Sequence, residues 1–163
     1  PPQPKPESTK CSSLDCLITL ARTCAKGEVT HRYTVDSPLG IPMQINGSTY
    51  FKLNGKNASG ACVLVYQSRG STATISQEDR ARMMAEGMTE AQINAQLKTI
   101  NESMNSDEAV KSVGTCTGTT ANVAAYLRDV KAGSGGSSCT ISFGQKETHC
   151  TVEPNLSCII RMP

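Results

Sequence analysis

The chain has 163 residues, a formal net charge of +2 and charged side chains at only 18% of its positions. Charges of both signs are interspersed without a basic stripe, which argues against a nucleic-acid-binding protein. No stretch of about 18 apolar residues occurs, so no membrane span is expected. The length fits one domain. Because the chain has no Trp and only two Phe, its core must come from aliphatic side chains and needs further support.

Eight cysteines can supply that support. Their even number and scattered positions in a polar background favour structural disulfides, which form in oxidising compartments. We therefore expect a secreted, periplasmic or cell-surface protein. The predicted disulfide-bonded residues are Cys11, Cys16, Cys24, Cys62, Cys116, Cys139, Cys150 and Cys158.

The first ten residues, PPQPKPESTK, are rich in proline, which favours extended and solvated backbone. This composition is typical of a mature end left after a signal peptide is removed, or of a stalk leading to a lipid anchor. Residues 1–10 are therefore predicted to form an extended tail. Residues 11–163 are predicted to form a single disulfide-stabilised α+β domain.

The first predicted helix spans residues 14–25. Ser12 or Ser13 is expected to cap it, and Ser12 with Asp15 fits a capping box. The apolar residues of one face recur at helical spacing. They are Leu14, Leu17, Ile18, Ala21 and Ala25.

A β-meander is predicted next. Residues 28–35 alternate between Val29, His31, Tyr33 and Val35 on one side and polar residues on the other, as in a half-buried strand. Further strands are expected at 41–45, 48–53 and 61–67. Asn46-Gly47 is a strong signal for a two-residue hairpin turn, and residues 54–60 predict a longer turn.

Residues 76–131 change to a helical pattern that is predicted to form two to three helices, either within the domain or as a subdomain. Ser76 opens the first and Gly87 ends it, while Thr89 and Gln92 form a capping box for the second. An apolar stripe then follows on Ile93, Leu97, Ile100 and Met104. The third helix is expected at residues 120–131.

After a flexible Gly/Ser loop at 133–138, strands are predicted again at 139–143, 149–154 and 157–163. The order of helix, meander, helices and strands defines an α+β fold. Disulfides are expected to cross-link it.

The cysteine spacing limits both pairing and chemistry. No Cys-x-x-Cys occurs, so zinc and thioredoxin-like redox motifs are missing. Cys16 and Cys24 would lie about 12 Å apart along a helix, too far for a mutual disulfide. Cys24 is expected to reach a core strand such as that starting at Cys62. Cys16 is expected to bond to Cys11 or to be covered by the C-terminal strands. Pairing is also expected among Cys139, Cys150 and Cys158, or between one of them and Cys116.

The histidines give little support for catalysis. His149 precedes Cys150, but neighbouring strand residues point to opposite faces, and Cys150 is expected to be oxidised. His31 alternates with apolar residues and is expected to be partly buried. We predict no catalytic residue, metal or cofactor.

Four Asn-x-Ser sequons are candidate glycosylation sites, at Asn46, Asn57, Asn101 and Asn155. The expected function is a non-enzymatic interaction module, or a structural subunit of an extracellular or cell-envelope assembly. Such a chain would bind a protein partner or assemble with itself, through its tail and a strand edge. Two alternatives stay open. One is a secreted inhibitor or effector that binds a partner protein. The other is a small-ligand-binding protein or unrecognised enzyme, which a deep pocket with His31 and a carboxylate would favour.

Overall fold

One seven-stranded sheet organises the chain in the computed structural model, which describes residues 7–37, 42–134 and 146–163. The strand order is β1-β2-β3-β4-β5-β7-β6, and every neighbouring pair is antiparallel except β1 and β2. The strands are β1 (Thr9–Lys10), β2 (Gly27–Asp36), β3 (Gln44–Lys56), β4 (Cys62–Thr74), β5 (Val113–Gly118), β6 (Glu147–Val152) and β7 (Leu156–Arg161). The helices are α1 (Leu14–Ala21), α2 (Gln77–Ala85), α3 (Glu90–Met104), α4 (Asp107–Lys111) and α5 (Thr120–Lys131). The predicted α+β fold, with its N-terminal helix, meander and C-terminal strands, is confirmed.

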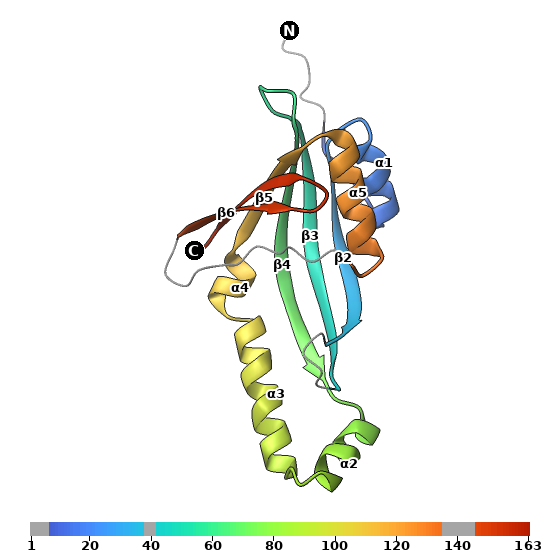
Figure 1. Ribbon diagram of the computed structural model, residues 1–163. Coiled ribbons are helices and arrows are strands. Elements are labelled where there is room, and N and C mark those ends of the chain that lie inside the picture. Colours follow the sequence, from blue (N-terminus) through green and yellow to red (C-terminus); the bar gives the residue numbers. More distant parts are fainter. Residues whose placement is uncertain (1–6, 38–41, 135–145) are drawn as a thin grey trace.

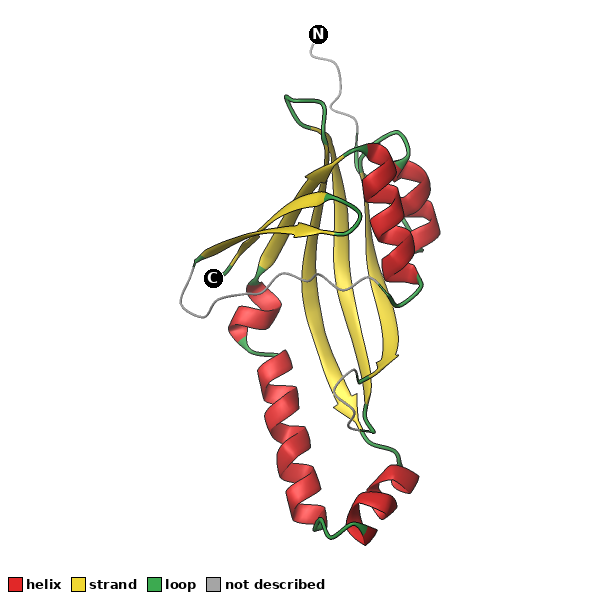
Figure 2. Cartoon of the chain, viewed as in Figure 1, coloured by secondary structure: helices red, strands yellow, loops and turns green. Residues whose placement is uncertain are grey.

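The helices are placed in two groups (Figure 1). Helices α1 and α5 pack side by side against one end of the sheet, while α2 and α3 form an arm at the far end of the long strands β3 and β4. Figure 2 shows the same separation, with β2, β3 and β4 extending beyond the part that α1 and α5 cover.

The main core lies between α1, α5 and one side of the sheet, which we call the core face. This face presents Val29, Phe51, Leu64 and Cys116, all 4% exposed or less. The opposite side, the open face, presents residues such as Thr30, Ser48 and Val65. On the open face, each described side chain from the strands is exposed or half-buried. A second apolar cluster joins the arm to the strand ends and consists of Met43, Ala73, Met83, Ile93 and Leu97.

The predicted hairpin turn at Asn46-Gly47 is wrong. Strand β3 runs straight through it, and Gly47 pairs with Tyr33 on one side and Ser71 on the other. A Cβ at Gly47 would lie 2.5 Å from the Tyr33 phenol oxygen, so the glycine makes room for an aromatic ring lying across the strand. Tyr66 crosses Gly114 in the same way, with 2.2 Å between its Cζ and a hypothetical Cβ. Here the glycines serve aromatic packing on a sheet rather than a turn.

The real reversal between β3 and β4 falls within the predicted longer turn. Asn57 organises it, because its side-chain oxygen accepts hydrogen bonds from the Ser59 and Ala61 amides at 3.1 and 2.9 Å. This is the local side-chain bonding that makes Asn a turn residue.

Helix α1 is shorter than predicted. Its N-cap is Ser13, whose Oγ accepts from the Cys16 amide at 3.4 Å, so the Ser12–Asp15 capping box is not the cap used. The helix ends at Ala21 instead of residue 25. Cys24 adopts φ 56°, and the Ala25 amide bonds back to the Leu20 carbonyl at 3.0 Å. This left-handed ending turns the chain towards β2.

The signals predicted for the other helices are confirmed, but residues 76–131 form four helices instead of two to three, with strand β5 between α4 and α5. Ser76 caps α2, and Gly87 follows it with φ 101°. Both hydrogen bonds of the Thr89–Gln92 capping box are present, and α5 spans the predicted residues. The short elements β1, α4 and β5 had no sequence prediction. The predicted strand at 139–143, and most of the Gly/Ser loop, lie outside the described residues.

Candidate interaction edge

The disulfides hold the sheet and α1 together. Cys24 bonds to Cys62, as predicted, and joins the end of α1 to the start of β4. Cys11 bonds to Cys16, which selects one of the two alternatives for Cys16. Cys116 and Cys158 bond across directly paired positions of β5 and β7, with 4.0 Å between their Cα atoms.

The remaining cysteines agree with an oxidised protein. Cys150 is disulfide-bonded, while Cys139 lies outside the described residues. Within the described ranges, no helix has the length and hydropathy needed to cross a membrane. The disulfides are consistent with an extracellular protein.

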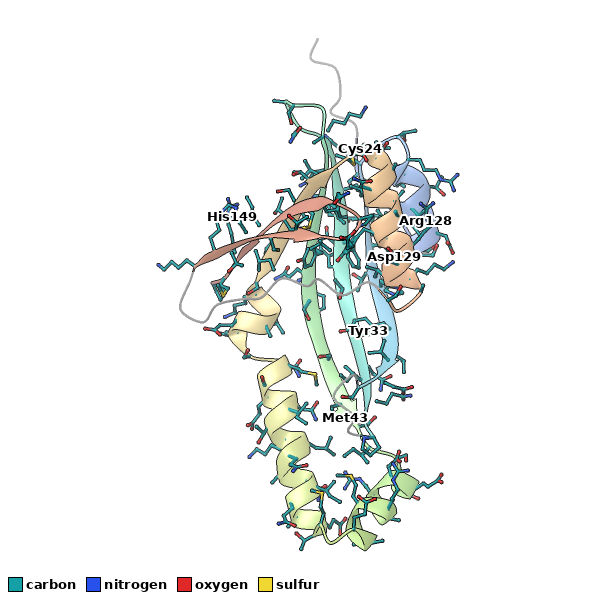
Figure 3. All side chains as sticks on the ribbon, in the orientation of Figure 1. Cys24, Tyr33, Met43, Arg128, Asp129 and His149 are labelled. Carbon is teal, nitrogen blue, oxygen red and sulfur yellow. A yellow bond between two sulfur atoms is a disulfide. The ribbon has the colours of Figure 1, made fainter. Side chains whose placement is uncertain are left out.

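His149 and Cys150 do not form a nucleophile and its base. Cys150 is oxidised, and the exposed His149 ring lies 2.9 Å from a Glu147 carboxylate oxygen. The other Glu147 oxygen accepts from Arg161 at 2.9 Å. The Arg161 hydrogen bond, followed by that of His149, lowers the pKa of Glu147 below its usual value. Figure 3 places His149 on the outer strands, away from Cys24 and Tyr33.

His31 is half-buried on β2, and burial lowers the pKa of its ring. It lines a surface hollow of about 430 Å³ together with Asp15, Arg32 and Lys131. The hollow combines a histidine with a carboxylate, the combination that would favour an enzyme or small-ligand protein. However, Lys131 donates to both Asp15 oxygens, at 2.7 and 2.8 Å, and no side-chain hydrogen bond joins the His31 ring to another described residue. The carboxylate is therefore not arranged as an acid–base partner for His31.

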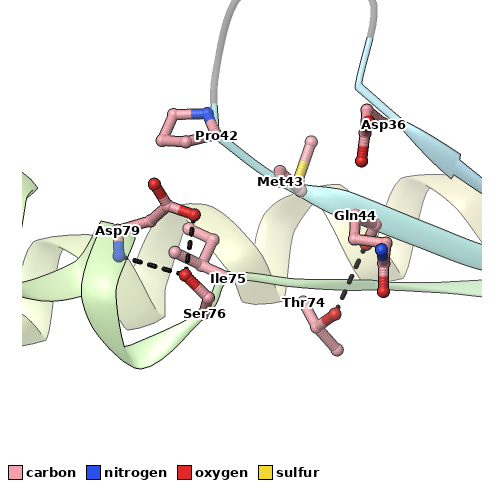
Figure 4. Close-up of a pocket in the computed structure, with 8 residues that line it drawn as sticks. All are labelled: Asp36, Pro42, Met43, Gln44, Thr74, Ile75, Ser76 and Asp79. Atoms are coloured by element: carbon pink, nitrogen blue, oxygen red, sulfur yellow. Dashed lines mark hydrogen bonds between the residues drawn. The ribbon is translucent and has the colours of Figure 1, made fainter.

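A second hollow, of about 420 Å³, lies where β2 ends and α2 begins (Figure 4). Met43 and Ile75 provide apolar surface, and the Asp79 carboxylate lies at its side. That carboxylate already accepts from Ser76 at 2.7 Å and Arg82 at 2.6 Å. The Asp79 carboxylate, with Ser76 and Arg82, therefore stabilises the start of α2. Among the described residues, His, Cys, Asp and Glu side chains form no group of three or more that could hold a metal ion.

The four sequons lie in different environments. The Asn57 amide is in an exposed loop, where its oxygen organises the turn. The Asn46 side chain, on β3, accepts a hydrogen bond from the Thr34 hydroxyl of β2 at 2.7 Å. Asn101 uses both of its amide groups internally, and Asn155 has φ 69° in the turn between β6 and β7. Glycosylation stays a prediction, and Asn57 is the site best placed for it.

Helices α3 and α4 cover the free edge of β4 with side chains. Strand β5 pairs with β4 only as far as Tyr66. Beyond that point, the Asn101 amide accepts from the Ala73 N–H at 2.7 Å and donates to the Ala73 carbonyl at 3.2 Å. Asn105 makes the corresponding bonds to Ser71 at 3.1 and 2.7 Å. The two asparagines, one helical turn apart, take the place of a neighbouring strand. Such covering prevents unwanted strand pairing.

The edge of β2 is not covered in this way. Strand β1 pairs with β2 only at Gly27 and Glu28, and the last bond there runs from the Cys11 N–H to the Glu28 carbonyl at 2.8 Å. At the other end of β2, the Ser37 N–H donates to Met43 at 2.8 Å and so points towards the β3 side. Backbone groups alternate in direction along a strand.

It follows that the even-numbered residues of β2 direct their N–H and C=O groups outward. For Thr30, Arg32 and Thr34, these groups have no partner among the described residues. We call residues 30–36 the β2 edge. Figure 1 shows this part of β2 at the margin of the sheet, extending past α1 and α5.

The open face beside the β2 edge carries arginine, tyrosine and small polar groups. Arg32 is paired with Ser48 in register, and Arg69 lies at the same level on β4. These three residues line a hollow of about 400 Å³. The Arg69 guanidinium sits 4.9 Å from the centre of the Tyr50 ring, and the Tyr50 hydroxyl donates to Glu28 at 2.8 Å. Burial, and then Glu28, raises the pKa of Tyr50.

Sequence reasoning did not identify the β2 edge. The alternation in residues 28–35 correctly separated the core face from the open face, but it contains no information on which strands are neighbours. No protein-family model, curated protein or solved structure matches the chain.

Proposed function

We propose that this chain is an extracytoplasmic, non-enzymatic interaction module that binds an extended protein segment along the β2 edge. The observation that carries the proposal is the row of outward backbone groups at Thr30, Arg32 and Thr34, which have no partner among the described residues. An added strand would form main-chain hydrogen bonds with these groups, the mode of recognition known as β-augmentation.

The contrast with β4 supports this proposal. An uncovered strand edge invites pairing with other chains, so proteins usually block it. Here α3 uses Asn101 and Asn105 to cover the free edge of β4. The β2 edge has no such cover from the described residues, and it is as long as the strands that commonly take part in pairing.

The disulfides beside the β2 edge also support the proposal. Cys11–Cys16 closes the chain between β1 and α1, and Cys24–Cys62 fixes the segment that leads from α1 into β2. A strand whose start is held in this way loses little conformational entropy when a partner binds. Preorganisation of this kind raises affinity.

The test removes one outward N–H without changing the ladder between β2 and β3. Thr34→Pro does this, since proline is tolerated on an edge strand where the N–H faces solvent. Thr34→Ala is the matched control, because it also loses the hydroxyl bonded to Asn46 but keeps the N–H. A random-peptide display library is selected against the immobilised, oxidised chain, and the enriched peptides are titrated against both variants.

We expect enriched peptides to bind Thr34→Ala as they bind the natural chain, and to bind Thr34→Pro at least about tenfold more weakly. If Thr34→Pro does not fold, Thr30→Pro and Thr30→Ala provide the same comparison. A selection that yields no binding peptide would overturn the proposal. So would peptides that bind the proline and alanine variants equally well.

A further inference from the structure

We propose that the segment that pairs with the β2 edge is β2 of a second copy of this chain. The two strands would run antiparallel about a two-fold axis beside Thr34, so that Arg32 of each copy faces the partner's Asp36. This inference rests on the β2 edge being the binding surface, and it adds the identity of the partner.

The backbone directions define which registers are available. Outward groups belong to even-numbered residues, and in an antiparallel pair such residues oppose one another and exchange both hydrogen bonds. A two-fold dimer pairs each surface with itself, so two β2 strands must meet antiparallel. The free part of the edge begins after Glu28, where β1 and Cys11 stop.

Charge selects one register among these. With the axis beside Thr34, the two threonines are opposite each other, and Arg32 is opposite the partner's Asp36 on both sides of the axis. Directly opposed charges of opposite sign stabilise a strand pair, as do paired threonines. Arg32, Thr34 and Asp36 are all exposed, and the two charged side chains have no ion pair with another described residue.

The neighbouring registers are less favourable. With the axis beside Arg32, the two arginines would face each other and Thr30 would face the partner's Thr34. The only other charged pair, Glu28 with the partner's Asp36, would also oppose like charges. With the axis beside Tyr33, Arg32 would face the partner's Thr34 and the charge pairing would be lost. Because β1 and Cys11 already pair with Glu28, the free part of the edge, residues 30–36, complements itself in one register.

Charge reversal provides the test. Arg32→Asp places aspartate opposite Asp36, and Asp36→Arg places arginine opposite Arg32, so each variant alone is expected to associate roughly tenfold or more weakly than the natural chain. The double variant, Arg32→Asp with Asp36→Arg, restores both opposed pairs and should associate again. Lys98→Asp, at an exposed position of α3, makes the same charge change as Arg32→Asp and should have no effect.

A mixture of the two single variants makes the test more specific. Each single variant repels itself, but Arg32→Asp of one chain faces Asp36→Arg of the other with opposite charge. We therefore expect heterodimers in the mixture, identified by native mass spectrometry with one variant isotopically labelled. Sedimentation velocity at concentrations from micromolar to millimolar gives the dissociation constants, which should rise with ionic strength.

The outcomes separate the two proposals. A natural chain that stays monomeric at millimolar concentration overturns the self-pairing, and so does association that the two single reversals leave unchanged. Neither result affects the display selection, which tests the β2 edge as a binding surface for any strand. Association that the single reversals weaken, and that the double variant and the mixture restore, supports the second copy as the partner.

Discussion

Removal of the Cys24–Cys62 disulfide is expected to cost about twice as much stability as removal of Cys11–Cys16. The two bonds close loops of very different length, with sequence separations of 38 and 5 residues. In the chain-entropy description of cross-links, these separations correspond to about 4 and about 2 kcal/mol at 25 °C. Each double alanine variant removes two sulfurs, so the difference of about 2 kcal/mol reflects mainly the loop lengths.

Burial should increase this difference. Cys24 and Cys62 are 5% and 1% exposed, whereas Cys11 and Cys16 are half-buried. Alanine at the two buried positions leaves unfilled space in the core, and such space adds to the loss of stability.

Guanidinium unfolding of the oxidised proteins measures these losses as free energies extrapolated to water. Thiol titration under denaturing conditions is the control, because it shows that the remaining cysteines keep their disulfides. Equal losses for Cys24→Ala/Cys62→Ala and Cys11→Ala/Cys16→Ala would refute the reasoning. A larger loss for the short loop would refute it more strongly.

Two further predictions concern α3 and α5. Asn101→Ala removes both hydrogen bonds to Ala73 and leaves a strand N–H unpaired, so we expect the free energy of unfolding in urea to fall by about 2–3 kcal/mol. Gln96→Ala, exposed on the same helix, is the control and should cost about 0.5 kcal/mol or less. Similar losses for the two variants would contradict the role of Asn101 in covering the β4 edge. Burial raises the pKa of Tyr126 above the usual tyrosine value of 10.0, so the folded state retains a proton that the unfolded state loses. Stability should therefore fall as pH rises above 10.0. Tyr126→Phe should weaken this dependence without abolishing it, because the pKa of Tyr50 is raised as well; an unchanged pH profile for Tyr126→Phe would argue against a buried phenol as the cause.

The helices were predictable because their signals are local. The range of α5, the Ser76 cap and the Thr89–Gln92 capping box depend on residues within a few positions of one another. The end of α1 was not predictable in the same way. Its last turn gives way to a left-handed Cys24 that is bonded to a residue 38 positions later.

The strands were predictable only in part, because their neighbours are distant in sequence. Asn46-Gly47 has the composition of a tight turn, yet it lies within a strand because Tyr33, on the adjacent strand, needs the space above Gly47. The β2 edge depends on strand order, which local composition does not encode. The pairing of Cys24 with Cys62 agrees with the prediction, although the helical position assumed for Cys24 was wrong, because α1 ends at Ala21.

Tyr33 and Tyr66 lie across Gly47 and Gly114, and their rings can protect the strand backbone beneath them from water. Figure 3 shows Tyr33 on the part of the sheet beyond α1 and α5, where none of the described helices lies over it. There the Tyr33 ring lies over the backbone of Gly47, so it shields the hydrogen bonds between β2 and β3 from water. Hydrogen exchange of the backbone amides in the middle of β2 and β3 is therefore expected to be slowest around Gly47.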